Sequence, residues 1–166
     1  MDSPQQIQGG LPTIATSKEL PSGTTLRVGT DCSGLEAPMM ALQNLGIEHE
    51  HIFSCDNDPN VAKTIKANFQ PKHFYDDLTT RKTATMPIVD LYIAGFPCQP
   101  FSNAGKQQGF DDEKGRGTIF FHVHEYIQMK RPKVFILENV KGITTLHRGK
   151  YLRTIIKSLR SIVDAL

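Results

Sequence analysis

Cys98 lies in residues 95–102, a segment in which prolines flank it on both sides. Prolines stiffen the backbone, and the apolar residues before this segment predict that the sulfur is exposed at the end of a strand. An accessible thiol that can form a thiolate is a nucleophile for covalent catalysis. The alternative is a small buried apolar residue, the common role of a free cysteine, and Cys32 and Cys55 fit that alternative better.

Glu138 directly follows four apolar residues, 134–137, which predict a buried strand. We therefore expect its carboxyl group to be partly buried, and burial favours the protonated form that can donate a proton in catalysis. The alternatives are a helix cap and an ion-pair partner.

Gly34 and Asp56 are 22 residues apart and follow the first two predicted strands. A glycine in a strand-to-helix turn lets a ligand approach the backbone. An acid about 20 residues later holds the ribose hydroxyls in nucleotide-binding folds. Because Glu36 and Met39 stand where further glycines would hold a pyrophosphate, the pattern favours a nucleoside without phosphates. The alternative is an ordinary turn and an exposed acid, and Asp77 is open to the same two interpretations.

The elements that must position these residues alternate between strands and helices. Short apolar runs predict strands, and apolar residues at helical spacing predict helices. The predicted strands cover residues 26–30, 51–55, 73–75, 89–94 and 134–137, and the predicted helices cover residues 37–45, 60–68, 118–129 and 149–163. The apolar face of the last helix comprises Tyr151, Leu152, Ile155, Ile156, Leu159, Ile162 and Val163.

This alternation predicts the α/β class, with a doubly wound, mostly parallel sheet that helices cover on both faces. Ligands of such sheets bind outside the carboxyl ends of the strands. We expect the strand ends to bring acids, a thiol and polar residues to one edge: residues 31–34, 56, 77, 95–98 and 138–139.

The composition indicates one globular domain. The 166 residues are 39% hydrophobic and 22% charged, with a formal net charge of +2, which allows a packed core and does not itself indicate a nucleic-acid partner. There is no membrane-length apolar run and no signal-peptide core, so we expect an intracellular protein. Residues 1–25 are rich in Gln, Ser, Thr, Gly and Pro and predict a disordered tail before a domain at residues 26–166.

Neither a disulfide framework nor a metal site is indicated. The three cysteines form no Cys-x-x-Cys pair. His122 and His124 lie in a predicted helix, where residues two apart do not share a face. Within the glycine-rich stretch 95–117, residues 105–117 are typical of a mobile lid, and the alternative is a disordered loop. Residues 130–160 hold nine Lys/Arg and one acid, a basic excess that fits either a phosphate backbone or a solvated helix face.

Four segments, in this order, resemble motifs of the cytosine carbon-5 DNA methyltransferases, which use S-adenosylmethionine. Residues 94–102 resemble the nucleophile motif, residues 105–111 the closing loop, residues 116–121 the motif after it, and residues 137–142 the acid motif. The resemblance covers residues 26–145. It implies a Rossmann-like methyltransferase fold, here incomplete, that methylates DNA, as in restriction–modification systems.

The resemblance assigns catalysis to Cys98, which would attack carbon 6 of a flipped-out cytosine, and to Glu138, which would engage ring nitrogen 3. The resemblance also implies that residues in or beside the closing loop and the acid motif contact the substrate: Gln99, Ser102, Arg116 and Asn139. Cofactor contacts fall to residues at the strand ends and the next helix: Asp31, Cys32, Ser33, Gly34, Asp56, Asn57, Asp77, Leu78, Pro97 and Ile119. Among these, Asp56 would hold the ribose and Asp77 the adenine amino group.

The chain departs from the family pattern in two ways. Cys32, Glu36 and Ala37 stand where the family usually has an aromatic residue and a glycine pair, and Asn57 stands where an apolar residue is common. The sequence also stops before the family's later arginine, target-recognition and final motifs. We therefore expect little or no activity from the chain alone, as a fragment, a decayed copy, or one part of an enzyme that needs a complementary C-terminal subunit.

Two alternative functions stay open at this point. One is a tRNA cytosine carbon-5 methyltransferase, and the other is a non-catalytic binding remnant. The expected location is the nucleus in a eukaryote and the cytoplasm otherwise.

Overall fold

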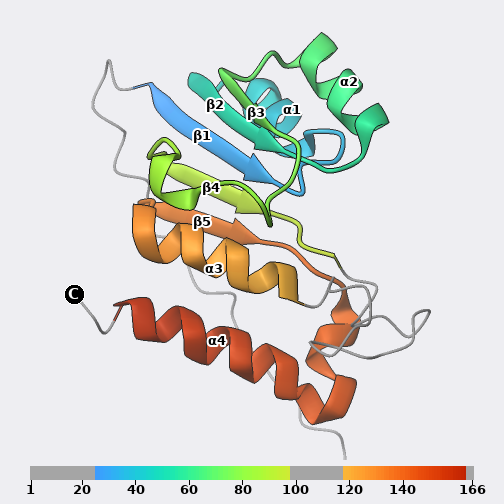
Figure 1. Ribbon diagram of the computed structural model, residues 1–166, viewed down its shortest axis with the longest axis vertical. Helices are drawn as coiled ribbons and strands as arrows, with labels where there is room; N and C mark the ends of the chain where they lie inside the picture. The colour runs from blue at the N-terminus through green and yellow to red at the C-terminus, as the bar shows by residue number, and fades with distance from the viewer. Residues whose placement is uncertain (1–24, 98–117, 164–166) are drawn as a thin grey trace, which may run out of the picture.

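The computed structural model describes residues 25–97 and 118–163, leaving aside the side chain of Val163. Within them, five parallel strands form one sheet in the order β3-β2-β1-β4-β5 (Figure 1). The strands are β1 (Leu26–Asp31), β2 (His49–Cys55), β3 (His73–Tyr75), β4 (Leu91–Ala94) and β5 (Val134–Leu137). The helices are α1 (Ala37–Asn44), α2 (Pro59–Asn68), α3 (Ile119–Lys130) and α4 (Lys150–Val163), with 3₁₀ turns η1 (Thr83–Thr85), η5 (Lys141–Thr144) and η6 (Leu146–Gly149).

This topology confirms the predicted doubly wound parallel sheet. Every predicted strand and helix is present, with bounds that differ by no more than two residues, whereas the three 3₁₀ turns were not predicted. No described helix is long and apolar enough to cross a membrane.

The start of α2 shows why the bounds of the helices could be predicted from the sequence. Asp58 caps the helix, because its side chain accepts hydrogen bonds from the backbone N–H groups of Asn60 at 2.7 Å and Val61 at 3.3 Å. Pro59 occupies the first helical position, where its missing N–H costs no hydrogen bond.

The two faces of the sheet carry cores of different size. On β4, Leu91 belongs to a small core with Val28 and α1, whereas Tyr92 and Ala94 belong to a large core with α3 and α4. This alternation follows from the two-residue period of a strand. Helices therefore lie on both faces, with α3 and α4 side by side in Figure 1.

Aromatic rings fill the large core around the end of β1. The rings of Tyr92 and Tyr126 lie 4.5 Å apart between centroids, and those of Phe53 and Tyr126 lie 5.4 Å apart. The Tyr126 hydroxyl donates to the carbonyl of Pro87 at 2.8 Å, so this buried polar group is satisfied. Gly29 leaves the space on β1 that the Phe53 ring occupies.

The prediction of a buried strand at residues 134–137 was wrong. β5 forms an edge of the sheet, and Val134 and Ile136 are 55% and 51% exposed. Their partners across β4 are Leu91 and Ile93, so both point to the α1 face. No described helix covers β5 on that face, which explains the exposure.

The final helix carries one similar correction. Tyr151, Ile155 and Ile162 of α4 are buried as predicted, but Ile156, assigned to the same apolar face, is 40% exposed. It shares the outer side of the helix with Arg153 and Lys157, which are also exposed.

Replacing Gly29 with Ala should destabilise the fold by about 1–3 kcal/mol, the usual cost of overpacking a core. The added Cβ would lie less than 3.0 Å from three carbons of the Phe53 ring, which is fully buried. The free energy of unfolding in urea measures the loss.

Gly95→Ala is the matched control, because among the described residues the nearest group to its added Cβ would be the Glu138 carboxylate, at 3.4 Å. Equal stability of Gly29→Ala and the wild type would contradict the close contact between β1 and Phe53.

Candidate active site at the carboxyl edge of the sheet

The parallel strands bring the predicted site residues to one edge of the sheet. Asp31 ends β1, Asp56 follows β2, Asp77 lies two residues beyond β3, residues 95–97 follow β4, and Glu138 follows β5. The predicted grouping of strand ends is therefore confirmed for the residues that the structure describes.

The turn after β1 is hydrogen-bonded to the end of β2. The Gly34 N–H donates to the Asp56 carboxylate at 2.9 Å, and Gly34 has a φ of +53°, which favours glycine. The Ser33 N–H donates to the Cys55 carbonyl at 3.1 Å, and the Cys55 N–H donates back to the Ser33 hydroxyl at 3.0 Å. The 22-residue spacing thus corresponds to a direct contact between the glycine turn and the acid.

The Asp56 carboxylate is held in a fixed orientation. Its second oxygen accepts the N–H of Asp58 at 3.0 Å. Each carboxylate oxygen has a further lone pair, so Asp56 can still accept from hydroxyl groups of a ligand. Asn57, the next predicted cofactor residue, is exposed beside it.

Glu36 is a structural residue of this turn that the sequence did not reveal. Its side chain is fully buried, and one carboxylate oxygen accepts from the Thr30 hydroxyl at 2.7 Å and the Ser54 hydroxyl at 2.6 Å. His51 lies 3.4 Å from the same oxygen, while the other oxygen has no hydrogen-bond partner among the described residues. Glu36 therefore joins β1 to β2, and its φ of +55° lies in the left-handed region that favours glycine.

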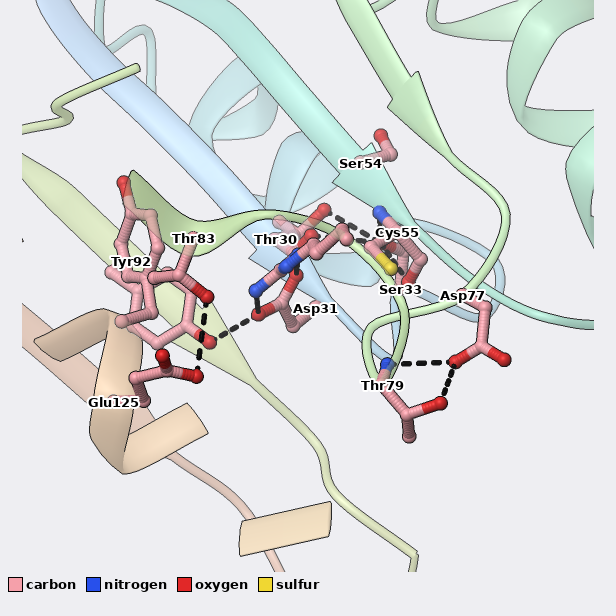
Figure 2. Close-up of polar contacts among 12 residues, drawn as sticks. Thr30, Asp31, Ser33, Ser54, Cys55, Asp77, Thr79, Thr83, Tyr92 and Glu125 are labelled. Atoms are coloured by element: carbon pink, nitrogen blue, oxygen red, sulfur yellow. Dashed lines mark hydrogen bonds and ion pairs between the residues drawn. The ribbon is translucent and has the colours of Figure 1, made fainter. Parts of the chain in front are cut away.

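Asp31 is buried, and its carboxylate is occupied by the protein itself. Figure 2 shows Asp31 joined to the Tyr92 hydroxyl, and the Arg81 guanidinium donates to both carboxylate oxygens. Burial, followed by the charge of Asp31, raises the pKa of Tyr92 well above its ordinary value, so the phenol stays protonated and donates. The Asp31 carboxylate is therefore not available to a ligand. The predicted contact of Asp31 with the cofactor stays a prediction, and only the backbone groups of Asp31 could make it.

The turn after β3 has a closed internal structure. The N–H and the hydroxyl of Thr79 both donate to one oxygen of Asp77 at 2.7 Å, as Figure 2 shows, and the Arg81 N–H donates to the Asp77 carbonyl at 3.2 Å. Leu78 is 7% exposed and packs in the large core. The turn therefore presents Asp77 at the edge and anchors Leu78 beneath it.

Glu138 and Asn139 are bonded to the end of β4. The Glu138 N–H donates to the Ala94 carbonyl at 3.0 Å, and the Asn139 side-chain amide donates to the Phe96 carbonyl at 2.9 Å. A Cβ added at Gly95 would lie 3.4 Å from a Glu138 carboxylate oxygen. The Glu138 carboxyl group thus lies beside the segment that leads into Cys98.

The predicted partial burial of Glu138 was wrong, because its side chain is exposed. The expectation rested on a buried strand before it. Since β5 is an exposed edge strand, the carboxyl group that follows it is exposed as well.

Several predicted site residues lie outside the described residues: Cys98, Gln99, Ser102 and Arg116. The predicted tail and the closing loop lie there too, and their roles stay predictions. On either side of the closing loop, Pro97 is half-buried and Ile119 packs against the large core. Among the described residues, no three His, Cys, Asp or Glu side chains are grouped as a metal site requires.

The described cysteines have thiols that resist ionisation. Burial, together with the nearby charges of Asp31 and Asp56, raises the pKa of Cys32 to about 12. Burial also raises the pKa of Cys55, which is 1% exposed in the core. Neither thiol is therefore a nucleophile at neutral pH.

Residues 31–162 match the family model of the C-5 cytosine-specific DNA methylases. The chain is 45% identical over 130 residues to the type II methyltransferase M.HpaII of Haemophilus parainfluenzae, a match that covers 77% of this chain and 35% of the relative. It is 41% identical over 122 residues to M.BanI of Aneurinibacillus aneurinilyticus, covering 74% of this chain and 27% of the relative. The chain thus spans about a third or less of the length of these two relatives.

The fold is similar to that of a solved methyltransferase. The crystal structure of Dnmt2 methyltransferase from S. pombe matches with a TM-score of 0.60 and 19% sequence identity, over 81% of this chain and 40% of that one. At this identity the likeness concerns the fold alone.

Cys32 and Cys55 should resist alkylation by iodoacetamide in the native protein at pH 8. With a pKa of about 12, Cys32 is a thiolate in about one molecule in 10⁴, against roughly a quarter for an unfolded cysteine. Peptide mass mapping should show labelling at least ~100-fold slower than in urea. Native labelling of Cys32 at the unfolded rate would contradict the described environment.

Proposed function

The chain belongs to the C-5 cytosine-specific DNA methylase family, and from this membership we propose that it forms the N-terminal part of an enzyme that methylates carbon 5 of cytosine in DNA. The observation that carries the proposal is the position of the Glu138 carboxylate beside Gly95. The ends of β4 and β5 therefore present the proposed acid next to the segment that continues into Cys98, the proposed nucleophile.

Cys98 and Glu138 divide the chemistry between them. The Cys98 thiolate bonds to ring carbon 6 of cytosine, and the ring electrons move to carbon 5, which becomes nucleophilic. Glu138 stabilises this change by donating a hydrogen bond or proton to ring nitrogen 3. After methylation, a solvent molecule takes the carbon-5 proton, and the freed electron pair re-forms the double bond and expels the Cys98 thiolate. Ring nitrogen 3 returns its proton to Glu138, so the enzyme is regenerated.

The described residues fit S-adenosylmethionine, which when bound supplies the methyl group from its sulfonium. Gly34 leaves open space at the turn, and the fixed Asp56 carboxylate beside it suits the ribose hydroxyls. Asp77 suits the adenine amino group at the neighbouring strand end. The Glu36 side chain forms its hydrogen bonds inside the protein, at a position where a glycine would be needed to hold a pyrophosphate. The turn therefore suits a cofactor without phosphates.

The DNA substrate requires a base to leave the stacked duplex, because the enzyme reaches both faces of the ring. We propose that Gln99, Ser102 and Arg116 contact the sugar-phosphate backbone around the flipped cytosine. Asn139, bonded to the Phe96 carbonyl, supports the same loop from the end of β5. The protein would act inside the cell, where genomic DNA lies.

The exposed edge strand β5 supports a second proposal, on where further methylase sequence would join this sheet. β5 consists of four apolar residues, of which Val134, Phe135 and Ile136 are at least 36% exposed. An unprotected apolar edge is typical of a strand that pairs with a further strand. We propose that the remaining methylase sequence, on the same chain or a separate one, adds a strand to β5.

The catalytic proposal is tested by covalent trapping. The chain is completed with the C-terminal part of M.HpaII and incubated with a duplex that contains 5-fluorocytosine and with S-adenosylmethionine, because fluorine at carbon 5 blocks release of the thiolate. A DNA adduct should form, Cys98→Ala should abolish it, and Glu138→Gln should slow it about 100-fold or more.

Glu48→Gln is the matched control, since Glu48 is an exposed glutamate at the opposite edge of the sheet, just before β2. Denaturing gel electrophoresis measures the adduct. An adduct that persists in Cys98→Ala, or none in the completed enzyme, would overturn the proposal.

The partner proposal is tested by Val134→Lys and Ile136→Lys. Each should weaken binding of the chain to the separate C-terminal part at least ~10-fold, because a charge at an apolar edge opposes strand pairing. Fluorescence anisotropy measures the affinity, and thermal unfolding checks that the chain itself is unchanged.

Leu45→Lys is the matched control, because Leu45 is a 72% exposed leucine at the end of α1, away from β5. Equal weakening by all three substitutions, or by none, would contradict docking on β5.

A further inference from the structure

A buried arginine connects two strand ends that are distant in sequence. Arg81 ends the turn after β3, and its side chain, 3% exposed, reaches Asp31 at the end of β1. Two guanidinium nitrogens donate to the two carboxylate oxygens, which fixes the distance and the relative orientation of the groups. Tyr92 donates to one of the same oxygens from β4.

Aromatic rings enclose the guanidinium on its other sides. Its central carbon lies 5.7 Å from the ring centroid of Phe53 and 5.8 Å from those of Tyr75 and Tyr126. Burial disfavours the charge, but the attraction to Asp31 outweighs it, and the pKa of Arg81 is raised. Arg81 is therefore a permanent cation in a rigid position.

Arg81 is also the last residue of the turn that holds Asp77. Its N–H closes the turn on the Asp77 carbonyl at 3.2 Å, while Thr79 holds the Asp77 carboxylate through two hydrogen bonds of 2.7 Å. The turn is therefore fixed internally by Thr79 and attached to the central strand β1 by Arg81.

Stability alone does not account for this arrangement. Desolvation of two charges offsets most of their attraction, and apolar replacements of buried ion pairs are often neutral or stabilising. An apolar pair at these two positions would lack the two parallel hydrogen bonds between the guanidinium and the carboxylate. Those two bonds set the position of the turn relative to β1.

We propose that Arg81 is a positioning residue, which holds the Asp77 turn at the distance from β1 that the adenine of the cofactor requires. This inference rests on the proposed function, because it takes Asp77 as the acceptor for the adenine amino group. Arg81 acts through Asp77 and does not touch the ligand itself, since its guanidinium is buried.

The experiment compares two ligands that differ only at that amino group. The probes are S-adenosylhomocysteine and its analogue with an unsubstituted purine, in which a hydrogen replaces the amino group. Calorimetry on the completed enzyme measures both dissociation constants. The wild type should bind the adenosyl ligand at least ~10-fold more tightly, because the analogue has no amino group to donate a hydrogen bond to the Asp77 carboxylate.

The double variant Arg81→Met with Asp31→Asn removes both charges and leaves none unpaired. Its preference between the ligands should fall to about twofold or less, as in Asp77→Asn, while thermal unfolding stays cooperative. Arg81→Lys keeps the positive charge but cannot donate two parallel hydrogen bonds to the Asp31 carboxylate, so it should lose part of the preference for the adenosyl ligand. This variant provides the test if the double variant does not fold.

Lys133→Met is the matched control. It removes an ion pair with Asp90, 2.8 Å long, at the opposite edge of the sheet, and should leave the ligand preference unchanged. A folded double variant, or Arg81→Lys, with the wild-type preference would overturn the role of Arg81. A wild type that binds neither ligand would instead overturn the proposed function, and with it this inference.

Discussion

The carboxylate of Asp31 is the constraint around which the sheet edge is organised. It ends the central strand, is 1% exposed, and faces the aromatic core, where an unpaired charge would cost several kcal/mol. Arg81 and Tyr92 supply the partners from the neighbouring segments. The ends of β1 and β4 and the turn after β3 are thereby held in one arrangement, next to the Gly34 turn that Asp56 and Glu36 fix from the other side.

Much of this arrangement was predictable, because local pattern determines it. Apolar runs and a capped helix start such as Asp58–Pro59 placed the strands and helices within two residues, and parallel topology then brought the strand ends together. Arg81 and Glu36 were not identified, since their roles depend on partners brought close only by the fold. Arg81 pairs with a residue 50 positions away, and Glu36 has a buried partner 18 positions away.

Burial was the property that local pattern predicted least well. The residues of β5 are as apolar as those of β4, yet Val134 is 55% exposed and its neighbour Leu91 across the pair is buried. The difference is positional: β4 lies between two strands and two layers of helices, whereas β5 has one strand beside it. The exposure of Glu138 has the same cause, because Glu138 directly follows the edge strand β5.

The open side of β5 also has a consequence for how copies of this chain behave together. Two copies related by a twofold axis would align their β5 strands antiparallel, which continues the hydrogen-bond ladder across both molecules without any change of fold. Self-association through this ladder would compete with the proposed pairing of β5 with further methylase sequence, and protein concentration would decide between them by mass action. If the remaining methylase sequence proposed above is a separate chain, its production at the same time and place would favour that pairing over self-association.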